Sequence, residues 1–211
     1  MASRSILFAV IVAAGAPACA TAVREQAPIL QPGAPGEATR TIPAEDVSSL
    51  PRPGHTAADI AFMQGMIGHH RQAVEMVALL QTRTSSEAMK NLAQRIAVSQ
   101  ADEIQMMKEW LEDRGAEPPS DHGHHDAALM PGMLTAEEMQ QLAAAKGPAF
   151  DRLFLESMIR HHEGALIMVR DLFATPGAGQ DADIYAFASD VDADQRMEII
   201  RMAGMLKELQ K

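Results

Sequence analysis

The sequence predicts an all-α protein in which two repeated helical hairpins, joined by a long crossover, pack as a four-helix bundle. Apolar residues recur at helical spacing in four long segments of the 211-residue chain. A motif of 15 residues occurs twice, at an offset of 92. Because one hairpin cannot bury its apolar face alone, the two copies are expected to pack together. No segment shows the alternation of apolar and polar residues that is typical of a half-buried strand, so we expect no β-structure.

Residues 1–22 have the pattern of a secretory signal peptide. Arg4 precedes a short apolar run, which gives way to small residues. The run is about half as long as the roughly 18 residues that a membrane-spanning helix needs. Cys19 is the one cysteine, so no internal disulfide can form, and either its lipidation or cleavage beside an alanine fits the segment. We therefore expect an exported protein of the periplasm or cell envelope, with a membrane contact only through a lipid anchor on Cys19.

Residues 23–56 separate this signal peptide from the helical part. They are rich in proline, interspersed with Gly, Ala and Thr, and they lack a sustained apolar period. This composition predicts an extended or disordered linker. The four-helix domain is then expected over residues 57–211, divided into a first hairpin, 57–114, a crossover, 115–147, and a second hairpin, 148–209.

Apolar spacing and end signals place the helices in order. Thr84-Ser85-Ser86-Glu87 resembles a capping box ahead of the second helix. A similar pattern at Thr135 begins a short helix inside the crossover. The four long helices are expected over residues 57 to about 80, from beyond 87 to about 115, from about 148 to 174, and from about 181 to 209.

The repeat places two pairs of histidines at equivalent positions. Residues 59–73 align with residues 151–165, and Asp, Phe, Met, Ile, both His and Ala coincide. In the first copy Met66, His69 and His70 are three and four residues apart, so their side chains project from one side of the helix. His161 and His162 repeat this arrangement. Because both pairs lie near the midpoints of their helices, we expect four imidazoles to meet in the middle of the bundle.

A buried imidazole needs a partner, and a metal ion can supply one. Burial without a hydrogen bond costs on the order of 1–3 kcal/mol. Thioether and imidazole donors together favour copper, particularly Cu(I), and zinc is the alternative. The candidate metal ligands are His69, His70, His161, His162, Met66, Met158, Met76 and Met168.

Two further groups of residues complete the candidate site. The partner helices carry side chains that could satisfy the imidazoles without a metal, or support them behind one: Gln100, Glu103, Gln195 and Glu198. The crossover carries a second, weaker candidate metal site, for which a solvated polar loop is an equal alternative: His122, His124, His125, Met130 and Met133.

The repeated pattern also resembles a known family. Phe-x3-Met-Ile-x-His-His-x2-Ala-x2-Met occurs at residues 62–76 and again at 154–168. It resembles the domain of unknown function 305 family, which includes CopM-like proteins, over about residues 57–209. This resemblance implies a ferritin-like four-helix arrangement and an exported protein that binds copper through methionine and histidine. It implicates Met66, His69, His70, Met158, His161 and His162.

These observations favour an exported metal-binding protein that buffers copper, confers resistance to it or transfers it. The expected partners are a metal ion and a copper-donating or copper-accepting protein, and a homo-oligomer is left open. The net charge of -10 argues against nucleic acid. No catalytic motif is evident, so we expect no enzyme. The alternatives are a ferritin-like di-metal oxidoreductase, although no long helix carries its Glu-x-x-His pattern, and a non-metal helical interaction module in which histidines act as a pH switch.

Overall fold

The computed structural model describes residues 29–31, 38–49, 53–120 and 129–209. The chain divides into two units, residues 1–51 and 52–211. The expected signal peptide, with Cys19, lies outside the described residues. In the first unit, strand β1 (Ile29–Gln31) pairs antiparallel with β2 (Arg40–Ile42), and a 3-10 helix, η1 (Ala44–Ser49), follows.

The expectation of no β-structure is therefore wrong for this short hairpin. Its two strands have only three residues each. A strand of this length is too short to display an alternating pattern. Ile29 pairs with Ile42, and such β-branched side chains favour extended backbone.

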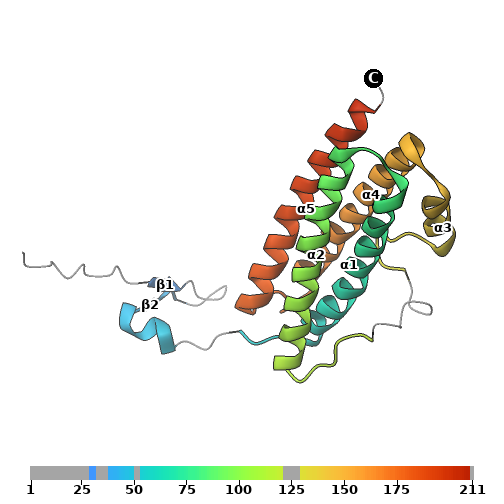
Figure 1. The fold of residues 1–211 in the computed structure, drawn as a ribbon. Helices are drawn as coiled ribbons and strands as arrows, with labels where there is room; N and C mark the ends of the chain where they lie inside the picture. Colours follow the sequence, from blue (N-terminus) through green and yellow to red (C-terminus); the bar gives the residue numbers. More distant parts are fainter. Residues whose placement is uncertain (1–28, 32–37, 50–52, 121–128, 210–211) are drawn as a thin grey trace, which may run out of the picture. The chain divides into compact units, whose positions relative to one another are not determined.

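The second unit confirms the predicted four-helix bundle. Its long helices are α1 (Ala57–Arg83), α2 (Glu87–Asp113), α4 (Gly147–Ala174) and α5 (Ala182–Glu208), and the crossover carries the short α3 (Ala136–Ala144). As Figure 1 shows, α1 and α5 run in one direction, whereas α2 and α4 run in the opposite direction. The two hairpins are α1–α2 and α4–α5, and α1 packs against α4. Within the described ranges, no helix combines the length and apolar character needed to cross a bilayer.

Side-chain caps fix where α1, α2, α3 and α5 begin, whereas α4 has no side-chain cap and carries a proline in its first turn. Asp59 completes a capping box with Thr56, and its second oxygen accepts a hydrogen bond from the Gly179 main-chain N–H at 2.7 Å. The predicted box at Thr135 is present at the start of α3. The box expected from Thr84 is absent, because Ser86 caps α2 and Thr84 instead ends α1.

Two apolar clusters fill the bundle, and a polar layer separates them. On α1, residues 62–67 belong to the first cluster and residues 73–80 to the second. Since α2 and α4 run the other way, their residues enter the clusters in the reverse order. Six of the buried polar residues lie in the interval between the clusters, with at least one on each long helix: His69 and His70, Gln100, His161 and His162, and Gln195. The repeat thus produces a single buried layer at mid-bundle.

Candidate metal centre

The histidines of the two copies meet where α1 packs against α4. The rings of His69 and His161 lie with their centroids 3.9 Å apart and their planes 39° apart. Both residues are 1% exposed, and His70 and His162 are fully buried. Within each pair the ring centroids are 6.3 Å apart, because adjacent residues on a helix point in different directions.

A carboxylate on the partner helix holds the second histidine of each pair. The His70 Nε2–H donates to Glu103 of α2, and the His162 Nε2–H donates to Glu198 of α5 at 2.6 Å. Burial raises the pKa of Glu103, but hydrogen bonds from His70 and Ser99 outweigh this effect and hold it below its ordinary value. Glu103 is therefore a carboxylate, which can only accept a hydrogen bond, and the proton on the imidazole lies on Nε2.

The crossover covers the first histidine of the α1 pair. The His69 Nε2–H donates to the main-chain oxygen of Pro131 at 3.1 Å. The Gln72 side chain donates to the main-chain oxygen of Leu134 at 2.9 Å and accepts from the Leu134 N–H at 2.7 Å. These bonds hold the segment Met130-Pro131-Gly132-Met133-Leu134 across α1.

On the α4 side, the main chain of the same segment lies directly against the main chain of the helix. A Cβ atom added to Gly164 would lie only 1.9 Å from the Pro131 oxygen, so no other residue fits this position without displacing the crossover. Gly132 has a φ of 76°, which favours glycine, and a Cβ on it would lie 2.4 Å from the Arg160 oxygen. Sequence reasoning missed this contact. The available indication was that Gly164 stands where the first copy has Gln72.

One nitrogen of each imidazole remains without a hydrogen-bond partner among the described residues. These atoms are Nδ1 of His69, His70 and His162, and Nε2 of His161. Protein hydrogen bonds, which could have satisfied the imidazoles without a metal, therefore reach only one nitrogen of each ring. Each unpaired buried acceptor costs roughly 1–3 kcal/mol.

The environment keeps the inner histidines neutral. Burial, followed by the neighbouring His70, lowers the pKa of His69 from 6.5 to about 3. Burial and then His69 lower the pKa of His161 well below 6.5. A neutral imidazole has a free lone pair, which is the form that binds a metal ion.

The candidate methionines are distributed around this layer. Met66 and Met158 are fully buried one turn before the histidines of their helices, Met76 is fully buried nearly two turns beyond His70, and Met168 is partly buried against the first cluster. Met130 of the crossover also lies at the bundle, because a Cβ on Gly65 would be 3.2 Å from its sulfur.

The other candidates have different positions. Met133 lies with Gln72 and Leu134 beside a hollow under the crossover. Gln100 and Gln195 are buried in the histidine layer, but the Gln100 Oε1 has no partner there. The crossover residues His122, His124 and His125 lie outside the described residues.

The donors fit a soft metal ion better than a hard one. Among the described residues, no group of three or more His, Cys, Asp or Glu side chains is arranged to hold a metal ion. This leaves a carboxylate-rich di-metal centre without such a group, and it means that the histidine layer itself would need thioether ligands or a shift of its rings to bind a metal ion. The free donors are imidazole nitrogens, with thioethers on adjacent turns. Copper, especially Cu(I), prefers this combination. The carboxylates contact the far nitrogens of the rings, which is where they orient metal-binding histidines in proteins.

Fold and site together define a four-helix bundle with a buried histidine layer. The family model described as "Domain of unknown function (DUF305)" matches residues 59–206. The chain therefore belongs to the DUF305 family, as the repeated motif predicted. No curated protein matches the chain significantly.

Solved structures that resemble this chain have the same fold. A DUF305 protein from Streptomyces coelicolor, named as a secreted protein, is 31% identical with a TM-score of 0.64, over 72% of this chain and 94% of that one. A DUF305 fragment from Deinococcus radiodurans is 29% identical with a TM-score of 0.65, over 74% and 99%. CopM in its Cu(II)-bound form is 27% identical with a TM-score of 0.60, over 71% and 96%.

Proposed function

We propose that this protein is an exported copper-binding protein that buffers copper, confers resistance to it or transfers it. The observation that carries the proposal is the set of four buried imidazole nitrogens without hydrogen-bond partners, in one layer flanked by thioethers. CopM, a structural relative, has been crystallised with Cu(II), with Cu(I) and with silver. The relative named as secreted, together with the signal-like residues 1–22, supports export.

The residues would act on the metal in two ways. His69, His70 and His162 would bind through Nδ1, since their Nε2 atoms are already bonded to protein oxygens. Glu103 and Glu198 would fix the orientation of their imidazoles and make them stronger donors. The thioethers of Met66 and Met158 would favour Cu(I) over zinc. We propose binding without catalysis, because every assigned role is to hold the ion.

Metal retention tests the proposal directly. The mature protein is dialysed separately against Cu(I), Cu(II) and Zn(II), then against metal-free buffer, and the bound metal is measured by elemental analysis. We expect stoichiometric copper and less zinc. Substoichiometric copper in both oxidation states would refute the proposal, and stoichiometric zinc without copper would assign the site to zinc instead.

Two variants locate the site. Replacing His69, His70, His161 and His162 together by glutamine should abolish copper retention. The matched control replaces His122, His124 and His125 by glutamine, which removes a similar number of imidazoles from the crossover. If the control variant loses as much copper as the fourfold variant, the mid-bundle layer is not the principal site. Helical circular dichroism of both variants checks that the bundle is intact.

A further inference from the structure

The histidine layer is closed on every side but one. The two apolar clusters fill the bundle on either side of it along the helix axes. On the face formed by α1 and α4, the crossover lies against Gly164 with no space between the main chains. The α1–α2 and α4–α5 faces are closed by the close packing within each hairpin, so the side that remains is the one where α2 and α5 face each other.

A groove runs between α2 and α5. Helix α1 packs closely along α4, whereas α2 and α5 approach each other at few points. One hollow of about 240 Å³ is lined from α2 by Leu92, Arg95 and Ser99, and from α5 by Asp194, Met197, Glu198 and Arg201. A second hollow of about 360 Å³ lies between the same helices and reaches Met63 of α1. We call these two hollows together the α2–α5 groove.

Two carboxylates connect the groove with the histidine layer. The side chains of Glu103 and Glu198 are 12% and 19% exposed, whereas their partners His70 and His162 are 0% exposed. Each carboxylate therefore extends from solvent to a buried imidazole. This is a continuous polar path through the wall of the bundle.

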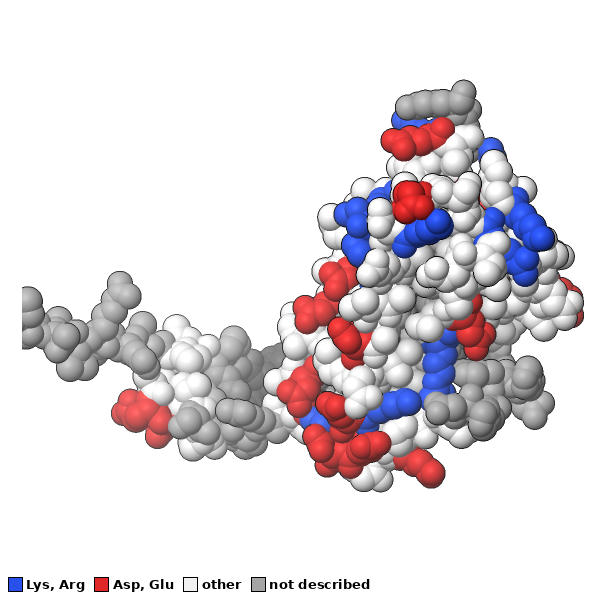
Figure 2. Space-filling model, viewed as in Figure 1, with Lys and Arg blue, Asp and Glu red and all other residues white. Residues whose placement is uncertain are grey.

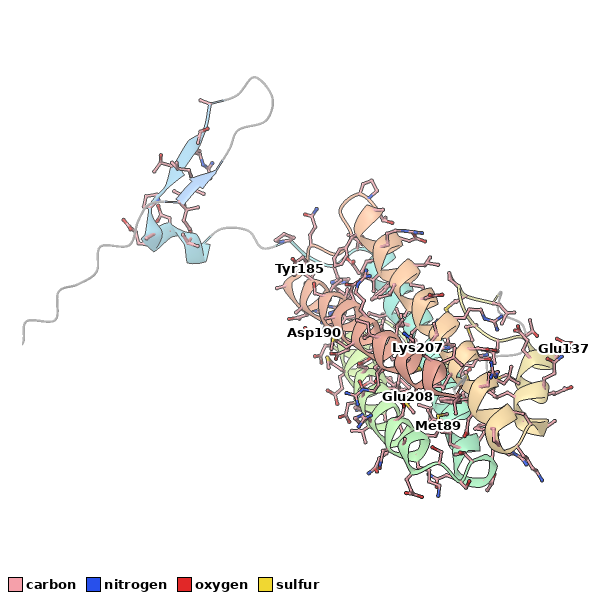
Figure 3. The ribbon with its side chains drawn as sticks, turned by 90° about the horizontal axis from the view of Figure 1, so that it is seen from above. Met89, Glu137, Tyr185, Asp190, Lys207 and Glu208 are labelled. Carbon is pink, nitrogen blue, oxygen red and sulfur yellow. The ribbon has the colours of Figure 1, made fainter. Side chains whose placement is uncertain are left out.

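The groove also concentrates negative charge. Burial raises the pKa of Asp194, and the nearby Glu103, Glu198 and Asp190 raise it further. Acidic side chains gather over the lower part of the bundle in Figure 2, and Figure 3 labels Asp190 on the side of α5 that borders α2. The second hollow adds Glu109, Asp113, Asp183 and Asp190, together with Arg114, which pairs with Asp183. The two hollows together carry six carboxylates against three arginines, and a net negative charge of this kind raises the local concentration of cations.

Each hollow carries an exposed methionine. Met197 is 64% exposed in the first hollow, and Met106 is 51% exposed in the second. Thioethers usually fill cores, so this exposure gives no packing advantage. A thioether is a soft donor, and beside a carboxylate it offers a first contact for a soft cation.

We propose that the α2–α5 groove is the route by which a soft metal cation enters and leaves the histidine layer. Asp194 and Met197 make the first contacts, and Glu103 and Glu198 lead from them to His70 and His162. This inference rests on the proposed metal binding of the histidine layer.

The test compares two Asp→Asn substitutions on α5. Asp194→Asn removes a charge from the groove. Asp192→Asn removes the same charge from the opposite side of α5, where Asp192 pairs with Arg196 beside a different hollow. Uptake of Ag⁺ from silver nitrate is followed by stopped-flow fluorescence of Trp110, the one tryptophan. Part of the fluorescence change is expected to report silver binding in the histidine layer. That part should be absent from the fourfold His→Gln variant, which identifies it.

We expect Asp194→Asn to slow uptake by about tenfold at low salt, and by much less at high salt, where surface charge is screened. Asp192→Asn should change the rate by less than about twofold. Saturated silver per chain should be equal in both variants and the wild type. Equal rates for the two variants, or loss of stoichiometric silver in Asp194→Asn, would overturn the route. A wild type that retains no silver would refute the proposed function itself.

Discussion

The metal-free protein should lose stability in acid because its inner histidines are buried as neutral rings. His69 has a pKa of about 3 in the folded chain against 6.5 ordinarily, and the pKa of His161 is lowered in the same direction. The unfolded chain therefore binds protons below pH 6.5 that the folded chain does not. The stabilising effect of these neutral rings is complete above pH 6.5 and is lost as the pH falls toward 3.

The size of the effect follows from proton linkage. Each such histidine lowers the free energy of unfolding by about 1.4 kcal/mol per pH unit within this window. Two of them remove roughly 5 kcal/mol over two pH units, which is comparable with the total stability of many domains. The assay is urea denaturation, followed by Trp110 fluorescence, at pH 7, 6, 5.5 and 5 in the presence of a chelator.

The control is the double variant His69→Gln/His161→Gln. All carboxylates are shared by the two proteins, so their contribution to acid denaturation cancels in the difference. The wild type should lose stability more steeply than the variant below pH 6.5. Parallel curves would refute the reasoning, because they would mean that these two rings are protonated in the folded state.

Three further predictions follow from the packing. Gly164→Ala should lower the free energy of unfolding by more than about 2 kcal/mol, since its Cβ overlaps the crossover. Gly204→Ala, with open space around it, should raise the free energy of unfolding by about 0.5–1 kcal/mol. Thermal denaturation measures both effects. Gln72→Leu should lower the free energy of unfolding by about 1–3 kcal/mol, because it removes two buried hydrogen bonds between the Gln72 side chain and the Leu134 main chain. The crossover should become more susceptible to protease as a result. Met66→Leu with Met158→Leu should change stability by less than about 1.5 kcal/mol but weaken Cu(I) in a chelator competition; unchanged affinity would exclude these thioethers as ligands.

The helices and the histidine layer could be predicted because they depend on periodicity. Apolar spacing defines a helix face, and the 92-residue offset places both histidine pairs at one depth in the bundle. Glu103 and Glu198 were also within reach of the sequence, because they occupy equivalent positions on the partner helices. The short β1–β2 hairpin was not, since three-residue strands carry no measurable period.

The crossover could not be placed from the sequence, because its contacts depend on main-chain atoms. The bond from His69 to the Pro131 oxygen involves a group that every residue possesses, so no residue type indicates it. Met130 was grouped with the crossover histidines because they are near in sequence. The structure places its sulfur beside Gly65 on α1, a contact that only the path of the chain determines.

Where the two copies of the motif differ, the difference accounts for how one crossover can cover both helices. Gln72 and Gly164 occupy the same position in the repeat. On α1 the long Gln72 side chain holds the crossover by two hydrogen bonds to Leu134, whereas on α4 the absence of a side chain lets Pro131 approach the helix main chain. A single segment cannot make identical contacts with two antiparallel helices. The repeated histidines therefore form the layer, and the difference between Gln72 and Gly164 determines how its α1–α4 face is closed.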